Sequence, residues 1–179
     1  MNFCSHCGAL VSLVIPEGDN RARYVCGSCA TTHYQNPRLV VGTIPEWEGK
    51  ILLCKRGIEP RLGKWTLPAG FMENGETVAD GARRETREEA LADVEHLEMF
   101  TVLSVPHVDQ VHVFFRAQLP SPEFGVTPES LEVELFTEAQ IPWDELAFRT
   151  VSTTLKHFFE DRRNGHFKLH TSAILPPPS

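Results

Sequence analysis

Three glutamates near the middle of the chain have the spacing to hold a divalent metal ion. On a helix, Glu85, Glu88 and Glu89 fall within an arc of about 100°. Glu85 and Glu89 are like charges at i and i+4, which weakens an isolated helix by roughly a few tenths of a kcal/mol. A solvated charged face is the alternative, but a helix would gain no stability from it. Carboxylate oxygens gathered on one face therefore predict Mg²⁺ or Mn²⁺ and chemistry on a substrate's phosphates.

A helix over residues 77–90 must position these carboxylates. Thr77 followed by Asp80 is typical of a capping box at the start of a helix. The remaining faces of this helix carry arginines and small residues: Arg83, Arg84, Arg87, Ala79, Ala82, Thr86 and Ala90. The small residues form an arc of their own, which would let the helix lie close against a sheet.

Four of the five cysteines, Cys4, Cys7, Cys26 and Cys29, form two Cys-x-x-Cys pairs with eighteen residues between them. This spacing is typical of a four-thiolate zinc site. Redox pairs or disulfides are the alternative, but a reducing compartment disfavours disulfides, and no βαβ pattern surrounds either pair. We expect a ribbon with two short strands, whose metal supplies the folding energy that so small a core lacks. The fifth cysteine, Cys54, is expected to be a small buried apolar residue.

The remaining pattern predicts a mixed domain. We expect three regions: a zinc ribbon over 1–35, the main domain over 36–165 and an extended tail over 166–179. Apolar runs predict strands over 39–44, 50–55, 94–96, 99–105, 111–118 and 131–136. The first two would form a hairpin with a longer loop around Glu46–Gly49, and a helix through Val151 and Phe158 would end at Asn164-Gly165.

Composition excludes several classes of protein. The 179 residues are 41% hydrophobic, and 17 Lys and Arg against 24 Asp and Glu leave a net charge of −7. These values are far from those of disordered chains, and an acidic surface argues against binding to nucleic acid or to membranes. No apolar run is long enough to span a bilayer, and the residues after Met1 do not resemble a signal peptide. We therefore expect a cytoplasmic protein.

The glutamates also carry a resemblance to a known family. The spacing of Gly70, Glu76, Arg84, Glu85, Glu88 and Glu89 resembles the Nudix box, G-x5-E-x7-R-E-U-x-E-E-x-G-U. Leu91 replaces the closing glycine, so the helix either carries roughly 1–2 kcal/mol of strain there or ends differently. Further stretches resemble the zinc-ribbon Nudix hydrolases of bacteria and the related plant chloroplast FAD pyrophosphohydrolase: 15–18, 34–37, 52–56, 63–71, 129–132 and 141–142. The resemblance implies an α+β fold, an α/β/α sandwich with a mixed sheet, preceded by the ribbon.

The resemblance also implies roles for individual residues. Glu85 and Glu89 would be the main ligands of Mg²⁺ or Mn²⁺, Gly70 would offer its carbonyl, and Glu88 would bind metal or polarise water. Glu76 and Arg84 would form a structural ion pair. Glu132 matches an acidic position that often serves as ligand or base, and a solvent-facing strand glutamate is the alternative. The residues that would bind substrate are Arg38, Lys55, Arg56, Lys64 and Phe71.

The reaction implied is hydrolysis of a nucleoside diphosphate linked to another moiety. FAD and ADP-ribose rank ahead of NADH, because the motif of NADH pyrophosphatases is absent around residues 104–110. A second hypothesis is a non-catalytic ligand sensor with a nucleic-acid-binding ribbon. Against it, Arg21 and Arg23 are matched by acidic neighbours, and no carboxylate of the box is lost. Relatives of this fold are often dimers, and Trp143 and Phe148 are candidates for a dimer interface.

Overall fold

The computed structural model describes residues 1–176, which divide into two compact units between Asn36 and Pro37. The first unit is a three-stranded antiparallel sheet of β1 (Val11–Val14), β2 (Arg23–Cys26) and β3 (Thr32–His33). The two expected strands are present, and the short third strand was not expected. So small a sheet buries little apolar surface, which leaves the cysteines as its main means of stabilisation.

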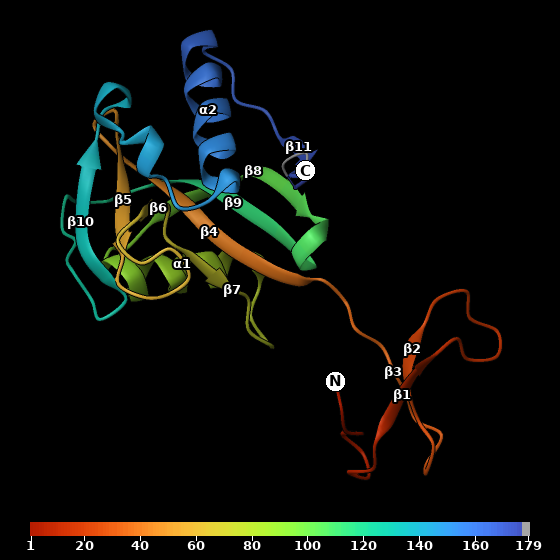
Figure 1. Cartoon of the computed structure of the whole chain (residues 1–179). Coiled ribbons are helices and arrows are strands. Elements are labelled where there is room, and N and C mark those ends of the chain that lie inside the picture. The colour runs from red at the N-terminus through yellow and green to blue at the C-terminus, as the bar shows by residue number, and fades with distance from the viewer. Residues whose placement is uncertain (177–179) are drawn as a thin grey trace. The chain divides into compact units, whose positions relative to one another are not determined.

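The second unit is built on one mixed sheet in the order β10-β5-β4-β9-β8-β11 (Figure 1). Its strands are β4 (Arg38–Trp47), β5 (Lys50–Arg56), β8 (Glu95–Val105), β9 (Gln110–Gln118), β10 (Ser130–Phe136) and β11 (His170–Ala173). The short strands β6 (Trp65–Thr66) and β7 (Ala69–Phe71) pair with β5 and β4. The central pair β4–β9 and the edge pair β8–β11 are parallel, and the other pairs are antiparallel. The predicted mixed sheet is confirmed.

Two helices, α1 (Val78–Ala90) and α2 (Arg149–Asn164), cover opposite faces of this sheet (Figure 1). On the α2 side, Phe158 and Leu155 pack into a cluster with Phe100. On the α1 side, Ala82 packs in a cluster with Val41 and Phe115. Three 3-10 turns complete the unit: η1 (Pro106–Val108), η2 (Glu138–Gln140) and η3 (Trp143–Glu145). The predicted α/β/α sandwich is confirmed.

The ends of the helices follow the sequence signals. The hydroxyl of Thr77 accepts a hydrogen bond from the N–H of Asp80 at 3.1 Å, and Gly165 ends α2 in the left-handed conformation. Leu91 ends α1 at φ 53°, also left-handed, with its N–H bonded to the carbonyl of Arg87. Of the two expected outcomes the strained one is therefore present, at a cost of roughly 1–2 kcal/mol.

The loop between β4 and β5 differs from the expectation of a longer connection. Glu46 pairs with Ile51 and Trp47 with Lys50, so only Glu48 and Gly49 remain in the turn. Both have positive φ, 45° and 79°. This conformation is typical of two-residue hairpins, because its twist matches that of the flanking strands. The prediction of a longer loop was wrong, because β4 continues three residues beyond the expected end.

The C-terminal segment was expected to be an extended tail. Within it, β11 adds to the edge of the sheet beside β8. Asp161 on α2 holds this segment: its carboxylate accepts from the N–H of Lys168 at 3.0 Å and lies 2.8 Å from Nε2 of His170. The part of the expected tail over residues 177–179 lies outside the described residues. None of the described helices combines the length and the apolar character needed to cross a membrane.

The contacts of Asp161 predict an acid-sensitive contribution to stability. Burial alone would raise the pKa of Asp161, but the hydrogen bonds from His170 and Lys168 outweigh it and hold that pKa below its usual value. The stabilisation is therefore present above the unfolded-state pKa and is lost as the pH falls through the folded-state pKa. We expect Asp161→Asn to lower the free energy of unfolding by about 2 kcal/mol at pH 7.

Chemical denaturation at several pH values measures this effect. The difference between wild type and Asp161→Asn should shrink below about pH 4, where the unfolded chain takes up a proton that the folded chain takes up only at lower pH. Asp144→Asn, at an exposed aspartate, is the matched control and should cost little at any pH. A difference that persisted unchanged at pH 3 would contradict this account.

Candidate active site and candidate metal centre

Two carboxylates of α1 are buried against the sheet. Glu85 and Glu89 are only 8% and 6% exposed, because they lie one turn apart on the same side of the helix. The N–H of Ala69 donates to Glu89 at 3.1 Å. A Cβ at Gly70 would lie 2.2 Å from Oε2 of Glu85. Position 70 must therefore be glycine for the Glu85 carboxylate to lie against the backbone of β7.

Burial gives these two carboxylates unusual acidities. It raises the pKa of Glu89 to about 8 and also raises the pKa of Glu85. Removing a carboxylate from water disfavours its charged form, and the negative charge of Glu85 further disfavours that of Glu89. A divalent cation would compensate both charges, and carboxylate oxygens are the donors that Mg²⁺ and Mn²⁺ prefer. The donor set on this face of α1 therefore fits such an ion.

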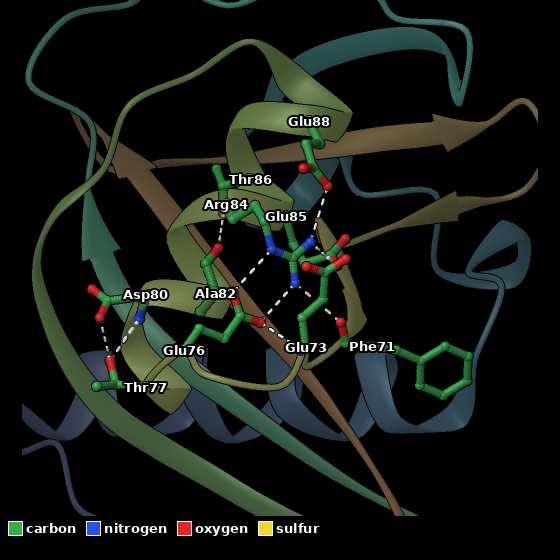
Figure 2. A network of polar contacts seen from close by, with 10 residues as sticks. All are labelled: Phe71, Glu73, Glu76, Thr77, Asp80, Ala82, Arg84, Glu85, Thr86 and Glu88. Atoms are coloured by element: carbon green, nitrogen blue, oxygen red, sulfur yellow. Dashed lines mark hydrogen bonds and ion pairs between the residues drawn. The ribbon is translucent and has the colours of Figure 1, made fainter.

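Arg84 is the centre of the polar network around these carboxylates (Figure 2). Its guanidinium donates to both oxygens of Glu76 at 2.8 and 3.0 Å, to Glu85 at 2.6 Å and to Glu88 at 3.0 Å. A further bond reaches the carbonyl of Phe71 at 3.0 Å, while the ring of Phe71 points away from the network. The hydrogen bonds from Arg84 hold the pKa of Glu76 at about 2. Arg84 thus ties α1 to β7 and to the loop before the helix.

A cavity of about 660 Å³ opens beside this face of α1. It is lined by six carboxylates together with basic, polar and apolar residues: Glu59, Glu73, Glu85, Glu88, Glu89, Glu129, Arg38, Arg56, Arg84, Gln110, His112, Val40, Ile58, Pro60, Ala69, Gly70, Phe71 and Phe148. The guanidinium of Arg38 lies 4.6 Å from the ring centre of Phe71. Of the residues expected to bind substrate, Arg38, Arg56 and Phe71 are therefore brought together with the box glutamates.

Three of the predicted site residues lie elsewhere. Lys55 and Glu132 are paired across β5 and β10, and Nζ of Lys55 donates to Glu132 at 2.7 Å. Lys64 precedes β6. None of the three lines the cavity. For Lys55 and Glu132 the strand register gives the reason. The two residues lie opposite each other on neighbouring strands, so their charges pair with each other at the sheet surface.

Sequence reasoning missed four titratable residues of the cavity, Glu59, Glu73, His112 and Glu129. Glu129 immediately precedes β10 and lines the cavity. The pairing of β10 with β5 is irregular just after it, with a register shift between Ser130 and Glu132. The stretch 129–132 was singled out in the sequence, but the strand register selects its first glutamate and not its last. His112, on β9, also lines the cavity, and burial lowers its pKa to about 4. A lone histidine within a strand carries no sequence signal.

The cysteines of the first unit form a compact cluster. The sulfur atoms of Cys4, Cys7, Cys26 and Cys29 all lie within 4.8 Å of one another. Cys4 and Cys29 are 3.7 Å apart, and Cys7 and Cys26 are 3.5 Å apart. A tetrahedron with Zn–S bonds of 2.3 Å requires sulfur separations of about 3.8 Å. The cluster therefore fits a structural zinc ion. Cys54 is buried in the second unit, as expected of an apolar residue.

Comparison with known proteins gives matches over both units. A family model described as Nudix N-terminal, a zinc ribbon, matches residues 2–35, and the NUDIX domain model matches residues 36–160. A crystal structure of a NUDIX hydrolase from Nitrosomonas europaea is 54% identical, with a TM-score of 0.95, and the match covers 98% of this chain and 100% of that one.

Two curated relatives are similar over shorter stretches. The NAD-capped RNA hydrolase NudC of Vibrio atlanticus (strain LGP32) is 34% identical over 102 residues, 56% of this chain and 35% of that protein. This chain thus spans about a third of the length of that relative. The ADP-ribose pyrophosphatase of Methanocaldococcus jannaschii is 33% identical over 119 residues, 64% of this chain and 69% of that protein.

The cysteine cluster predicts bound zinc and its loss on substitution. We expect about one zinc per chain in the purified protein and much less in Cys4→Ser, because three thiolates leave the tetrahedron open. Elemental analysis by mass spectrometry measures the zinc content. Cys54→Ala, which removes a thiol outside the cluster, should retain the zinc. Wild-type protein isolated without zinc would contradict the assignment.

Proposed function

Because this chain belongs to the Nudix family, we propose that it hydrolyses the diphosphate of a nucleoside diphosphate linked to another moiety. ADP-ribose and FAD are the leading substrates. Water adds to one phosphorus, the bridging P–O bond breaks, and the products are AMP and a second phosphate monoester. The observation that carries this proposal is the pair of buried carboxylates, Glu85 and Glu89, on the wall of a cavity that also contains arginines.

The charges of the cavity support a reaction on a diphosphate with the aid of metal. An anionic substrate would be repelled by six carboxylates unless cations offset them. Glu85 and Glu89 would hold Mg²⁺ or Mn²⁺, with the carbonyl of Gly70 as a further ligand. When bound, the ion would neutralise charge on the diphosphate and lower the pKa of the attacking water.

Other residues of the cavity would bind and orient the substrate. Arg56 is available for the diphosphate oxygens, although its Nε already donates to the carbonyl of Pro60 at 2.8 Å. The paired Arg38 and Phe71 offer a flat surface for a base, since Phe71 is 47% exposed. Glu88, whose side chain is 56% exposed, and Glu129 are the carboxylates best placed to accept a proton from water.

Two observations bear on the choice of substrate. The similarity to an ADP-ribose pyrophosphatase over 69% of that protein supports ADP-ribose. The similarity to an NAD-capped RNA hydrolase keeps NADH as an alternative. A ligand sensor is not favoured, because every carboxylate of the box is present and Glu85 and Glu89 both line the cavity.

A turnover panel tests the proposal. The full chain is incubated with Mg²⁺ or Mn²⁺ and FAD, ADP-ribose or NADH, and the products are identified by mass. AMP with ribose 5-phosphate, or AMP with FMN, would establish the reaction and choose between the leading substrates. Substrate binding without turnover in this panel would favour the sensor.

Glu89→Gln tests the metal assignment. This change keeps the shape of the side chain and removes a charged ligand, so kcat should fall by orders of magnitude while the fold is retained. Steady-state kinetics and circular dichroism measure the two effects. Glu134→Gln, at an exposed glutamate of β10, is the matched control and should keep wild-type activity. Normal turnover by Glu89→Gln would contradict the role of this carboxylate.

Glu129→Gln and Glu132→Gln distinguish the two glutamates near the start of β10. We expect Glu129→Gln to lower kcat by about 100-fold, as loss of a general base does, because Glu129 lines the cavity. Glu132→Gln should have little effect on kcat, because its carboxylate is paired with Lys55. A large loss of kcat in Glu132→Gln with little loss in Glu129→Gln would assign the general base to Glu132. Its ion pair with Lys55 would then have to open during turnover.

A further inference from the structure

A second cavity of about 500 Å³ lies beside the first. Pro60, Gln110, His112 and Phe148 line both cavities, so the two share a wall. The second cavity is bounded by η1, by the first residues of α2 and by the segment after β11. A substrate seated in the first cavity would therefore have room to extend across this wall.

The two cavities differ in charge. Six carboxylates line the first, whereas no Asp or Glu among the described residues lines the second. Its ionisable residues are Arg61, His107, His112 and Arg149. Neither arginine forms an ion pair with any residue over 1–176. Burial lowers the pKa of His112 to about 4, so this histidine is neutral at pH 7, and the two arginines give the cavity its positive charge.

The start of α2 adds to this positive character. Phe148, the N-cap residue, provides no side-chain acceptor for the first N–H groups of the helix. Thr150, in the first turn, is 4% exposed, and its hydroxyl has no hydrogen-bond partner within the described chain. The N-terminus of a helix attracts anions through its unpaired N–H groups and its dipole. Arg149, whose guanidinium donates to the carbonyl of Leu175, extends from this same turn.

We propose that the second cavity binds a phosphate group that the substrate carries in addition to the scissile diphosphate. The proposal rests on the proposed function and narrows its substrate class to phosphorylated forms of the dinucleotide or nucleotide sugar. Arginine side chains pair with phosphate through charge-assisted hydrogen bonds. The first cavity needs metal ions to accept an anion, but the second, without carboxylates, accepts one directly. The extra phosphate lies either on the adenosine or on the other moiety.

Binding and turnover with matched ligands test the two proposals separately. Dissociation constants for ADP-ribose, ADP-ribose 2′-phosphate and ADP-ribose 1″-phosphate are measured by calorimetry on the full chain with Ca²⁺ in place of Mg²⁺ or Mn²⁺, because a cation must offset the carboxylates of the first cavity. We expect one phosphorylated ligand to bind about ten-fold more tightly than ADP-ribose, as one added charge-assisted contact would give. The preferred ligand identifies which end of the substrate carries the phosphate.

Variants locate this preference. Arg149→Gln and Arg61→Gln should each reduce the ten-fold preference and leave the affinity for ADP-ribose unchanged. Arg163→Gln, which removes an arginine from the other end of α2, is the matched control and should keep the preference. Equal affinities for the three ligands, or a preference that survives both substitutions, would overturn the proposal. Absence of hydrolysis with added Mg²⁺ or Mn²⁺ would instead count against the proposed function and leave the binding result standing.

Discussion

The close packing of α1 against the sheet is the constraint on which the site depends. Small residues make it possible: Thr86 is fully buried, and its hydroxyl lies 2.6 Å from that of Thr43 on β4. A Cβ at Gly42 would lie 2.4 Å from Cβ of Ala69, so β4 and β7 also approach each other closely. Larger side chains at these positions would push the helix outward. The carboxylates of α1 would then lose their position against β7.

This packing creates an electrostatic cost that the surrounding residues offset only in part. Arg84 satisfies Glu76 and one oxygen of Glu85, but within residues 1–176 Glu89 receives only the N–H of Ala69. A buried carboxylate with one donor keeps a raised pKa, as Glu89 does. A surface that served stability alone would not keep such a residue. Local destabilisation of this kind is expected at a cation site, and it supports the proposed Mg²⁺ or Mn²⁺ at these carboxylates.

The two cavities place different demands on an anionic ligand. The first combines carboxylates with Arg38 and Arg56, so under the proposed function cations would have to balance the charge of a diphosphate there. The second offers Arg61 and Arg149 without opposing charge. A shared wall between an acidic and a basic cavity gives the molecule a polarity along which an asymmetric substrate can be oriented.

Local patterns in the sequence determined where the helices begin and end and which residues offer metal ligands. Strand register and contacts between distant segments decided which residues line the cavities. The cap at Thr77, the end of α2 at Gly165 and the cysteine cluster were predicted from residues close together in the sequence, and the mixed sheet was implied by the family resemblance. The two-residue turn at Glu48–Gly49 and the place of Glu129 were missed, because both depend on pairing partners distant in the chain. The walls of the second cavity likewise come from segments distant in the sequence: the loop at Arg61, the start of α2 and the segment after β11. Charges that meet only after folding leave no periodic signal in the sequence, so tertiary structure alone reveals them.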